Sequence, residues 1–331
     1  MEPRELLEAL VDVVATLGEL AATVAGPYRD VLLSVHPEAL YTALETFIDH
    51  LRDTLDQGGS TLKRPGVASL GQALDAFRAN LGATWAHVTA AASAWWDPVA
   101  TLEDSWARLA REATELRDAC RDAATAEDTT AATSSALAGD LQDKATRWGR
   151  ARDNLVAKAW QPLLALAKEK MASAEAAHEA RLEAATNELV AATEARIEAQ
   201  VATSVGGAAT RRGQRAEAAL GLLERLVAAC DKATAFPREL QCWLRDIEAA
   251  LKGTNESSPD VPEALVAVVA KVERLWEASA RLATRHLLGT LGDIRRLLSS
   301  SAGGPGGLSG RAVAMQCQKA IEDIPTLLRG Q

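Results

Sequence analysis

The feature of this sequence that most constrains its fold is a long stretch without a single charged residue. Between residues 79 and 96 the chain contains no Asp, Glu, Lys or Arg. Across 67–96, apolar residues recur in steps of three and four, which places them along one side of a helix. A helix that lacks a charged face is normally enclosed by other helices on most sides. We therefore predict a single helix over 67–96, about 45 Å long, at the centre of a helical bundle.

The same helical periodicity runs through the remainder of the chain, and no segment has the alternation typical of a strand. Near the N-terminus, apolar residues alternate steps of four and three, the spacing of a bundle or coiled-coil seam. These residues are Leu6, Leu10, Val13, Leu17, Leu20 and Val24. Ala, Leu, Glu and Arg dominate the composition, as is typical of helical proteins. We predict an all-α fold: an elongated multi-helix bundle of mainly antiparallel long helices, with coiled-coil-like packing and no sheet.

Glycine, proline and small polar residues mark the boundaries between the predicted helices. The predicted segments are, in order, an N-terminal helical bundle at 1–124 that contains the central helix 67–96, a linker at 125–136, a long-helix region at 137–252, a linker at 253–261, a long helix at 262–298, a flexible linker at 299–310 and a short terminal helix at 311–331. The sequence leaves two points open. A helix running straight through 125–136 is the alternative to a linker, and Pro162 either begins a new helix or kinks a continuous one.

The longest predicted element covers 162–205, which contains no glycine and no proline beyond its first residue. We expect Gly206 and Gly207 to end it. Its predicted apolar stripe advances by about 3.7 residues per step, which is closer to an eleven-residue repeat than to a heptad. The stripe consists of Leu164, Ala167, Met171, Ala174, His178, Leu182, Ala185, Leu189, Thr193, Ile197 and Val201. In this periodicity the helix resembles exchangeable apolipoproteins and lipid-droplet coat proteins, although the proline-punctuated repeats of the apolipoproteins are absent.

Charge is distributed unevenly along the chain, whose formal net charge is −9. Residues 1–60 hold 11 acids and 3 bases, a net charge of −8, whereas residues 141–170 hold 7 bases and 3 acids. The acidic segment is a candidate to contact a basic surface, in this chain or on a partner. The plainer interpretation is that these charges are solvated helix faces. A pI near 5.2 argues against nucleic-acid binding, which normally requires a basic face.

We expect a cytoplasmic protein without a transmembrane span. The acidic residues near the N-terminus, including Glu2, Glu5 and Glu8, differ from the basic start of a signal peptide. The uncharged run at 79–96 is rich in Ala and contains polar residues, so it is a poor transmembrane segment. The four cysteines lie far apart without a CxxC pair, which is typical of reduced thiols.

The sequence contains no residue pattern for catalysis, cofactor binding or metal binding. The five histidines lie on different predicted helices, without metal-ligand spacing to a second ligand. We interpret His178 as a core histidine on the stripe, and His50, next to Asp49, as part of an exposed pair. Nucleophile-elbow and phosphate-binding glycine motifs are absent. We therefore predict a non-enzymatic protein that uses no cofactor and no metal.

The eight tryptophans are the most specific hint of a binding surface. Adjacent Trp95 and Trp96 point about 100° apart on a helix, so both cannot occupy one seam. An exposed tryptophan suits contact with a partner protein or with the interfacial region of a bilayer. The alternative is that tryptophan fills gaps in an Ala-rich core. The candidate residues for partner or lipid contact are Trp95, Trp96, Trp106, Trp148 and Trp160.

These observations favour a scaffold or structural subunit that binds partner proteins or self-associates through long amphipathic helices. The runner-up is reversible binding to a lipid surface after the bundle opens, with peripheral lipid contact through the same helices. A stripe composed mainly of Ala buries little apolar area, which suits close helix–helix approach better than lipid partitioning. Protein association is therefore the leading hypothesis.

Overall fold

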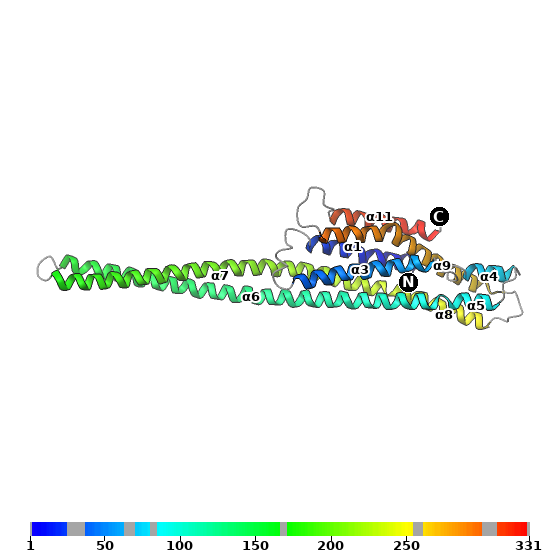
Figure 1. Cartoon of the computed structure of the whole chain (residues 1–331), viewed down its shortest axis with the longest axis horizontal. Coiled ribbons are helices and arrows are strands. Elements are labelled where there is room, and N and C mark those ends of the chain that lie inside the picture. The colour runs from blue at the N-terminus through cyan, green and yellow to red at the C-terminus, as the bar shows by residue number, and fades with distance from the viewer. Residues whose placement is uncertain are drawn as a thin grey trace. The chain divides into compact units, whose positions relative to one another are not determined.

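The computed structural model describes residues 2–24, 37–62, 70–79, 85–165, 171–253, 261–299 and 310–329. Within these ranges all regular structure is helical and no strand occurs, which confirms the predicted all-α bundle (Figure 1). In chain order the helices are α1 (Pro3–Val24), α3 (Pro37–Leu62), α4 (Leu70–Arg78), α5 (Trp85–Ser93), α6 (Trp96–Ala165), α7 (Met171–Ala233), α8 (Ala235–Gly253), α9 (Glu263–Leu282), the π-helical η2 (Ala283–Leu287), α10 (Leu288–Ser299) and α11 (Gly310–Arg329). Of the helices that the structure describes, none is long and apolar enough to cross a bilayer.

The chain divides into two compact units. Unit 1 consists of Met1–Arg121 and Ala216–Gln331, and unit 2 consists of Asp122–Arg215. The first part of α6 and the last part of α7 therefore belong to unit 1, and the remaining parts of these two helices form unit 2. The prediction of a linker at 125–136 is wrong, because α6 runs through these residues without interruption.

The packing of α1 follows directly from its sequence. All six residues of its predicted apolar stripe, from Leu6 to Val24, are buried. The helix packs against α10 and α11. At Gly18 the backbone of α1 comes so close to α11 that a Cβ atom would overlap the side chain of Val313. The absence of a side chain at this position therefore permits the contact between the two helices.

The helix predicted over 262–298 is confirmed, with a π-helical turn inside it. α9, η2 and α10 follow one another without a break. The apolar residues that recur along it in steps of three and four are all buried: Leu265, Val269, Val272, Trp276, Ala280, Ala283, Leu287, Leu291, Ile294 and Leu298. Twice in this series, at 272–276–280 and at 283–287–291, two steps of four residues follow one another. In a regular α-helix such a pair of steps would move the side chains around the helix axis. The extra residue in the π turn keeps the series on one side.

The prediction of one central helix at 67–96 is wrong. The described residues of this segment form α4 and α5, followed by a turn at residues 94 and 95 and the start of α6. The ring centres of Phe77 and Trp85 lie 5.1 Å apart. In one continuous helix these residues would be separated by about 12 Å along the axis. Within the charge-free run, α5 buries Trp85 and Val88 but exposes Ala86, His87 and Ala90, so the lack of charge does not mark a helix enclosed on all sides.

Other predicted boundaries agree with the structure only in part. The predicted linkers at 253–261 and 299–310 lie almost entirely outside the described residues. Pro162 neither begins nor ends a helix, because α6 continues through it to Ala165 and α7 begins at Met171. The element predicted at 162–205 is therefore divided between two helices. The terminal helix is α11, whose 20 residues continue through Pro325.

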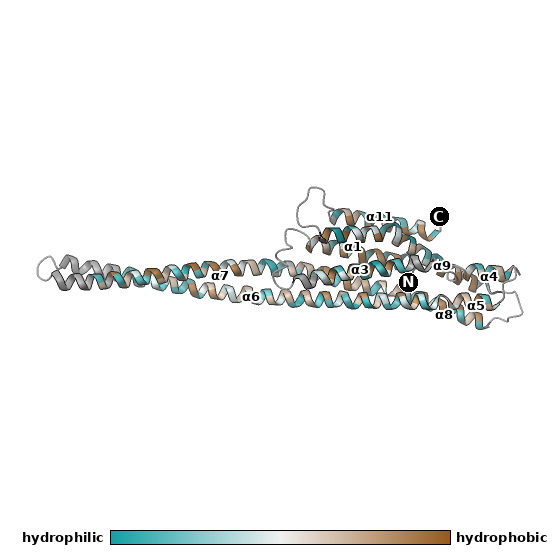
Figure 2. Cartoon of the chain, in the orientation of Figure 1, coloured by the Kyte–Doolittle hydropathy of each residue, from teal (hydrophilic) through white to brown (hydrophobic). Residues whose placement is uncertain are grey.

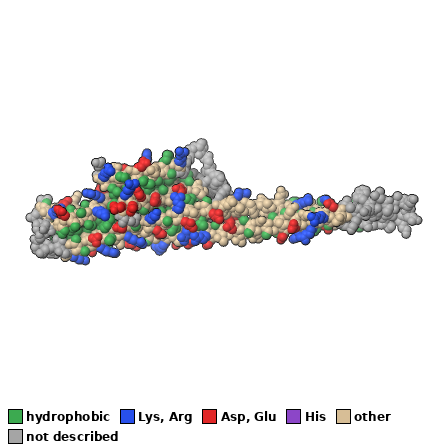
Figure 3. Space-filling model, turned by 180° about the vertical axis from the view of Figure 1, so that it is seen from behind, with side chains coloured by type: hydrophobic (Ala, Val, Ile, Leu, Met, Phe, Trp, Pro, Cys, Tyr) green, Lys and Arg blue, Asp and Glu red, His purple; other side chains and the backbone are tan. Residues whose placement is uncertain are grey.

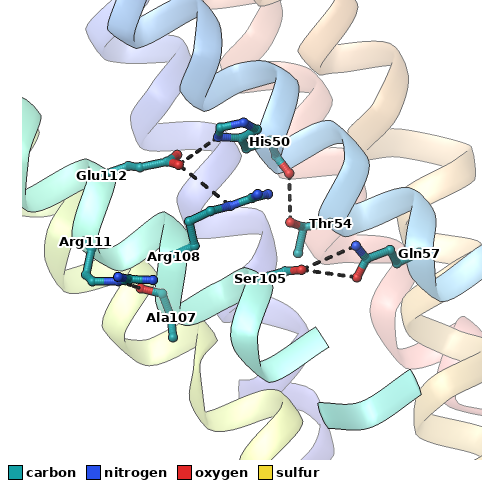
Figure 4. Close-up of polar contacts among 8 residues, drawn as sticks. All are labelled: His50, Thr54, Gln57, Ser105, Ala107, Arg108, Arg111 and Glu112. Atoms are coloured by element: carbon teal, nitrogen blue, oxygen red, sulfur yellow. Dashed lines mark hydrogen bonds and ion pairs between the residues drawn. The ribbon is translucent and has the colours of Figure 1, made fainter. Parts of the chain in front are cut away.

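Polar side chains join α3 to α6 in unit 1 (Figure 4). His50 Nδ1 lies 2.8 Å from Glu112 Oε1, and Arg108 Nε lies 3.7 Å from the same oxygen. The prediction that His50 forms an exposed pair with Asp49 is therefore wrong. Asp49 instead accepts a hydrogen bond from Arg295 Nη1 at 2.5 Å. His50 links two helices, whereas its neighbour contacts a third.

Part of the acidic surface of residues 1–60 meets bases within unit 1. Glu19 Oε2 accepts a hydrogen bond from Arg225 Nη1 at 2.6 Å, in addition to the contact between Asp49 and Arg295. Burial raises the pKa of Asp12 above its ordinary value, although the positive charge of Lys232 lowers it in part. These contacts connect α1 with α7 and α3 with α10. The excess of acid near the N-terminus is thus partly neutralised by the bundle itself.

Candidate interaction surface in unit 2

Within unit 2, α6 and α7 run side by side in opposite directions (Figure 1). Among the described side chains of α7 in this unit, the buried ones are alanine or glycine, at positions three, four or seven residues apart, as in a heptad pattern. They are Ala185, Ala192, Ala195, Ala199, Ala202, Gly206, Ala209 and Gly213. The buried residues of α6 in this unit, among those up to residue 154 whose side chains are described, are Ala124, Glu127, Leu141 and Ala145. We call the contact between these two series the small-residue seam.

Two glycines of α7 allow close approach to α6. A Cβ atom at Gly206 would lie 3.2 Å from Ser134 Cβ, and one at Gly213 would lie 2.9 Å from Asp128 Oδ1. Both distances are shorter than ordinary van der Waals contacts. The prediction that Gly206 and Gly207 end a helix is therefore wrong. α7 continues through both residues, and Gly206 permits packing against α6.

One charged pair lies in the small-residue seam. Arg212 Nε donates a hydrogen bond to Glu127 Oε1 at 2.8 Å, and only 5% of the Glu127 side chain is exposed. A buried carboxylate without its partner is strongly destabilising. Because sliding either helix would separate Glu127 from Arg212, the pair favours the observed register of α6 against α7.

The large apolar residues of unit 2 lie outside this seam. Nine large apolar side chains of the described residues are between 37% and 60% exposed, and eight of these belong to unit 2. The eight are Leu137 and Trp148 of α6, and Leu182, Leu189, Val190, Ile197, Val201 and Val205 of α7. Figure 2 shows hydrophobic residues, in brown, recurring along this part of α7. The predicted stripe is therefore wrong as a buried face: of its members whose side chains are described, only Ala185 is buried.

A shallow hollow of about 690 Å³ lies between the small residues of the two helices. It is lined by Ala138, Gly139 and Gln142 of α6 and by Arg196, Ala199, Gln200, Thr203 and Ser204 of α7. The lining holds one cation and several uncharged polar groups, without a carboxylate or a histidine. The hollow therefore offers no general acid or base at neutral pH.

Two of the tryptophans proposed as contact residues are internal. Trp95 is 0% exposed and Trp106 is 1% exposed, so neither is available to a partner. The ring of Trp95 packs edge-on against Trp276, with ring centres 5.4 Å apart. Such large rings fill the core of unit 1, in agreement with the alternative that tryptophan fills gaps between helices.

The other three candidate tryptophans differ from one another. Trp96 is half-buried, and its Nε1 donates a hydrogen bond to Glu248 Oε1 at 2.8 Å. Trp148 is 37% exposed in unit 2. The side chain of Trp160 lies outside the described residues. Of the four candidates whose side chains are described, Trp148 is the one that contributes exposed aromatic surface.

Several groups elsewhere in the described chain that could in principle react or bind a metal make structural contacts instead. No three His, Cys, Asp or Glu side chains of the described residues gather as a metal site requires. The Ser105 hydroxyl contacts Gln57, whereas the nearby His50 contacts Glu112, so no nucleophile is paired with a base here (Figure 4). Burial raises the pKa of Cys230 to about 12, which keeps this thiol protonated.

A second hollow, of about 360 Å³, lies in unit 1. Three bases line it, namely Arg4, Lys271 and Arg274. Arg4 pairs with Glu8 at 2.7 Å, and Lys271 Nζ lies 4.1 Å above the Trp243 ring. Two of the three basic side chains therefore already contact other residues of unit 1.

Reasoning from the sequence missed the small-residue seam, and with it the exposure of Val190 and Val205. The signal was present in the spacing of small residues. From Ala185 to Gly213, alanine and glycine fall on nearly every position of a heptad seam. Following the larger residues instead selects the outer surface of α7.

The surface of unit 2 combines apolar side chains with charges of both signs. Lys144, Arg147 and Arg150 are exposed on α6, and Figure 3 shows Lys and Arg side chains gathered next to the grey residues of α6 and α7. Apolar and aromatic side chains within a charged rim are typical of surfaces that bind protein. Comparisons with protein-family models, with curated proteins and with solved structures give no match to this chain.

Proposed function

We propose that this chain is a non-enzymatic helical scaffold, or structural subunit, that associates with protein through unit 2. The observation that carries this proposal is the concentration of exposed large apolar side chains in that unit. Unit 2 is less than a third of the chain, yet it holds eight of the nine such side chains among the described residues. Scattered single apolar residues are normal on a protein surface, whereas a local concentration marks an interaction surface.

The arrangement of the two helices supports the same proposal. α6 and α7 pack against each other through the small-residue seam. This packing leaves the side chains of Ile197 and Val201 uncovered, each 58% exposed. Covering apolar surface stabilises a complex by about 25 cal/mol per Å². A partner that covers these residues therefore gains free energy without any rearrangement of unit 2.

Binding to lipid is the competing function, and the seam makes it less favourable. Opening α6 from α7 would separate Glu127 from Arg212 and expose mainly alanine, which partitions weakly into lipid. Without opening, the exposed apolar residues of α7 are interspersed with Glu194 and Glu198. Carboxylates on that face are repelled by anionic lipid headgroups.

The proposal is tested by placing a photo-crosslinking amino acid at position 197 of the full chain, expressed in the native cells. We expect covalent protein adducts on illumination, detected by mass spectrometry. The matched control carries the same amino acid at position 245, in place of the exposed Arg245 of α8 in unit 1, and should give none of these adducts. Adducts with lipid alone at position 197, or identical adducts at both positions, would show that unit 2 is not the protein-binding surface.

A further inference from the structure

We infer that the outer face of α7 binds the same face of a second copy of this chain, with the two α7 helices antiparallel. This inference rests on the proposed function, because it names the occupant of the unit 2 surface. The residues concerned form what we call the outer series. They are Ala180, Glu183, Asn187, Val190, Glu194, Ile197, Val201, Ser204, Ala208 and Arg211.

The outer series has the spacing of a second helix-packing seam. Its members alternate steps of three and four along α7, from residue 180 to residue 211. The small-residue seam follows the same heptad spacing on the side that contacts α6. The two series therefore keep their separation along the helix, and the outer series stays exposed. All of its members are exposed except Ala208, which is half-buried, and Ser204 also borders the hollow between α6 and α7.

The centre of the outer series is apolar. Val190, Ile197 and Val201 are 50%, 58% and 58% exposed. They lie seven and four residues apart, so they fall on one side of α7. This is the spacing at which one helix inserts apolar side chains between those of another.

The charges at the two ends of the outer series are opposite in sign. Glu183 precedes the apolar centre and Arg211 follows it, and Ile197 lies midway between them. Among the side chains that the structure describes, none forms an ion pair with Glu183 or Arg211. The span from residue 183 to residue 211 corresponds to about 42 Å of helix.

Antiparallel pairing of two copies satisfies this charge distribution. With the two Ile197 side chains at the centre, Glu183 of each copy lies near Arg211 of the other. Parallel pairing would instead place Glu183 near Glu183, and Arg211 near Arg211. Opposite charges across an interface favour association and fix its orientation, whereas like charges oppose it. Glu194 is the single acid in the apolar centre. In the parallel arrangement it would face Glu194 of the second copy, whereas in the antiparallel arrangement it does not.

A second copy fits this face better than a lipid surface does. A bilayer would have to accept Glu183 and Glu194 on the same face as Ile197, and it offers no fixed cation opposite the first of these acids. A copy of the chain supplies both the apolar centre and the matching Arg211. The interface is isologous, so each favourable charge contact occurs twice.

The inference is tested by charge reversal in the full chain, with the dissociation constant of the dimer measured by analytical ultracentrifugation. Glu183→Arg and Arg211→Glu each turn two attractive contacts into repulsive ones in an antiparallel dimer. We expect each variant to weaken self-association about tenfold at low salt. The double variant E183R/R211E, and an equimolar mixture of the two single variants, should both regain the affinity of the original chain.

Matched controls reverse exposed charges of α6. Asp140→Arg and Lys144→Glu lie in the same unit, outside the outer series, and should leave the dissociation constant unchanged. Ile197→Glu should abolish association in any orientation that uses this face. Circular dichroism of every variant checks that the helices are intact.

The possible failures distinguish this inference from the proposed function. If Ile197→Glu abolishes association while the charge variants do nothing, the antiparallel pairing is wrong and the unit 2 surface stands. A chain that remains monomeric, or that floats with phosphatidylcholine–phosphatidylserine vesicles in a manner abolished by Ile197→Glu, overturns the second copy as occupant. Crosslinking at position 197 then decides the proposed function independently.

Discussion

Gly18 shows how a single missing side chain sets the distance between two helices. It lies on α1 where Val313 of α11 occupies the space that a Cβ atom would need. Valine is stiff about its Cα–Cβ bond, so it cannot easily turn aside. Any side chain at position 18 must therefore push α1 away from α11 or deform one of them.

We expect Gly18→Ala to destabilise the protein by about 1–3 kcal/mol, measured by urea unfolding followed by circular dichroism. The control is Gly221→Ala on α7, an exposed position of unit 1 with open space around it. There the alanine should stabilise the helix by up to about 1 kcal/mol. Combining Gly18→Ala with Val313→Ala should remove the clash but leave less buried area. If Gly18→Ala and Gly221→Ala have equal free energies of unfolding, then α1 and α11 are not in close contact at Gly18.

Glu273 of α9 forms a hydrogen bond with the backbone at the N-terminus of α4. Gly71 N donates a hydrogen bond to Glu273 Oε1 at 2.8 Å. Burial raises the pKa of this carboxyl above its ordinary value of 4.5, and the hydrogen bond from Gly71 opposes that shift. A carboxyl whose pKa is raised by folding binds more protons in the folded state. Its contribution to stability is therefore present below pH 4.5 and is lost as the pH rises through the folded pKa.

The charge of Glu273 is tested with Glu273→Gln, which keeps an oxygen that can accept the Gly71 hydrogen bond. We expect the free energy of unfolding of the variant, relative to the original chain, to increase from about pH 4 to pH 7. Urea unfolding at several pH values measures this difference. The control Glu263→Gln, at an exposed position of the same helix, should show no such trend. Parallel pH profiles for Glu273→Gln and the original chain would rule out the assigned shift.

Among single residues, burial could be predicted where a large side chain falls on a helical stripe. Trp106 occupies such a position between Leu102 and Leu109, and all three are buried. The partner of a polar group could not be predicted in this way. Glu112 lies 62 residues from His50 in sequence, and only the packing of α3 against α6 brings them together.

At the level of elements, the sequence predicts helices well where large apolar residues form the seam. In α6 the apolar residues that recur in steps of three and four are all buried except the last, Ala123, which is half-buried: Val99, Leu102, Trp106, Leu109, Ala113, Leu116, Cys120 and Ala123. The prediction fails where small residues form the seam, because alanine is equally common at exposed positions, such as Ala126, Ala132 and Ala136 of α6. The Thr- and Ala-rich residues 125–136 therefore resemble a linker by composition, although they are part of α6.

The contact between α6 and α7 can be tested at two adjacent glycines. A Cβ atom at Gly206 would lie 3.2 Å from Ser134 Cβ, so that Ser134 would have to shift, whereas a Cβ atom at Gly207 would only approach the flexible end of Arg211 at 3.8 Å. We expect Gly206→Val to destabilise unit 2 by about 1–3 kcal/mol. Gly207→Ala should instead stabilise α7 by up to about 1 kcal/mol.

Thermal unfolding followed by circular dichroism compares the two glycine variants, and limited proteolysis locates the weakened unit. Cleavage of Gly206→Val should increase within residues 122–215. If Gly206→Val and Gly207→Ala behave alike, then Gly206 is not required for the approach of α6.

For the whole molecule, the two units differ in what they bury. Unit 1 encloses Trp95, Trp106, Trp276 and Phe47 almost completely, whereas the small-residue seam of unit 2 consists mainly of alanine and glycine. Each buried methylene contributes about 0.8 kcal/mol. Each turn of helix in unit 2 is therefore held by less apolar area than a turn in unit 1, so unit 2 should open more readily unless another molecule covers it.

Helix α7 allows this difference to be measured within one helix by hydrogen–deuterium exchange. Its residues 185–213 contact α6 through small side chains, whereas Leu223 and Leu226 anchor its last turns in unit 1. We expect amides of 185–213 to exchange at least about tenfold faster than those of 223–230, because local opening there exposes less apolar surface. Raising the protein concentration should slow exchange in the first segment only, since association covers Ile197 and leaves unit 1 unchanged. Uniform exchange along α7 at every concentration would mean that unit 2 is as stable alone as unit 1, and that its exposed apolar residues gain nothing from a partner.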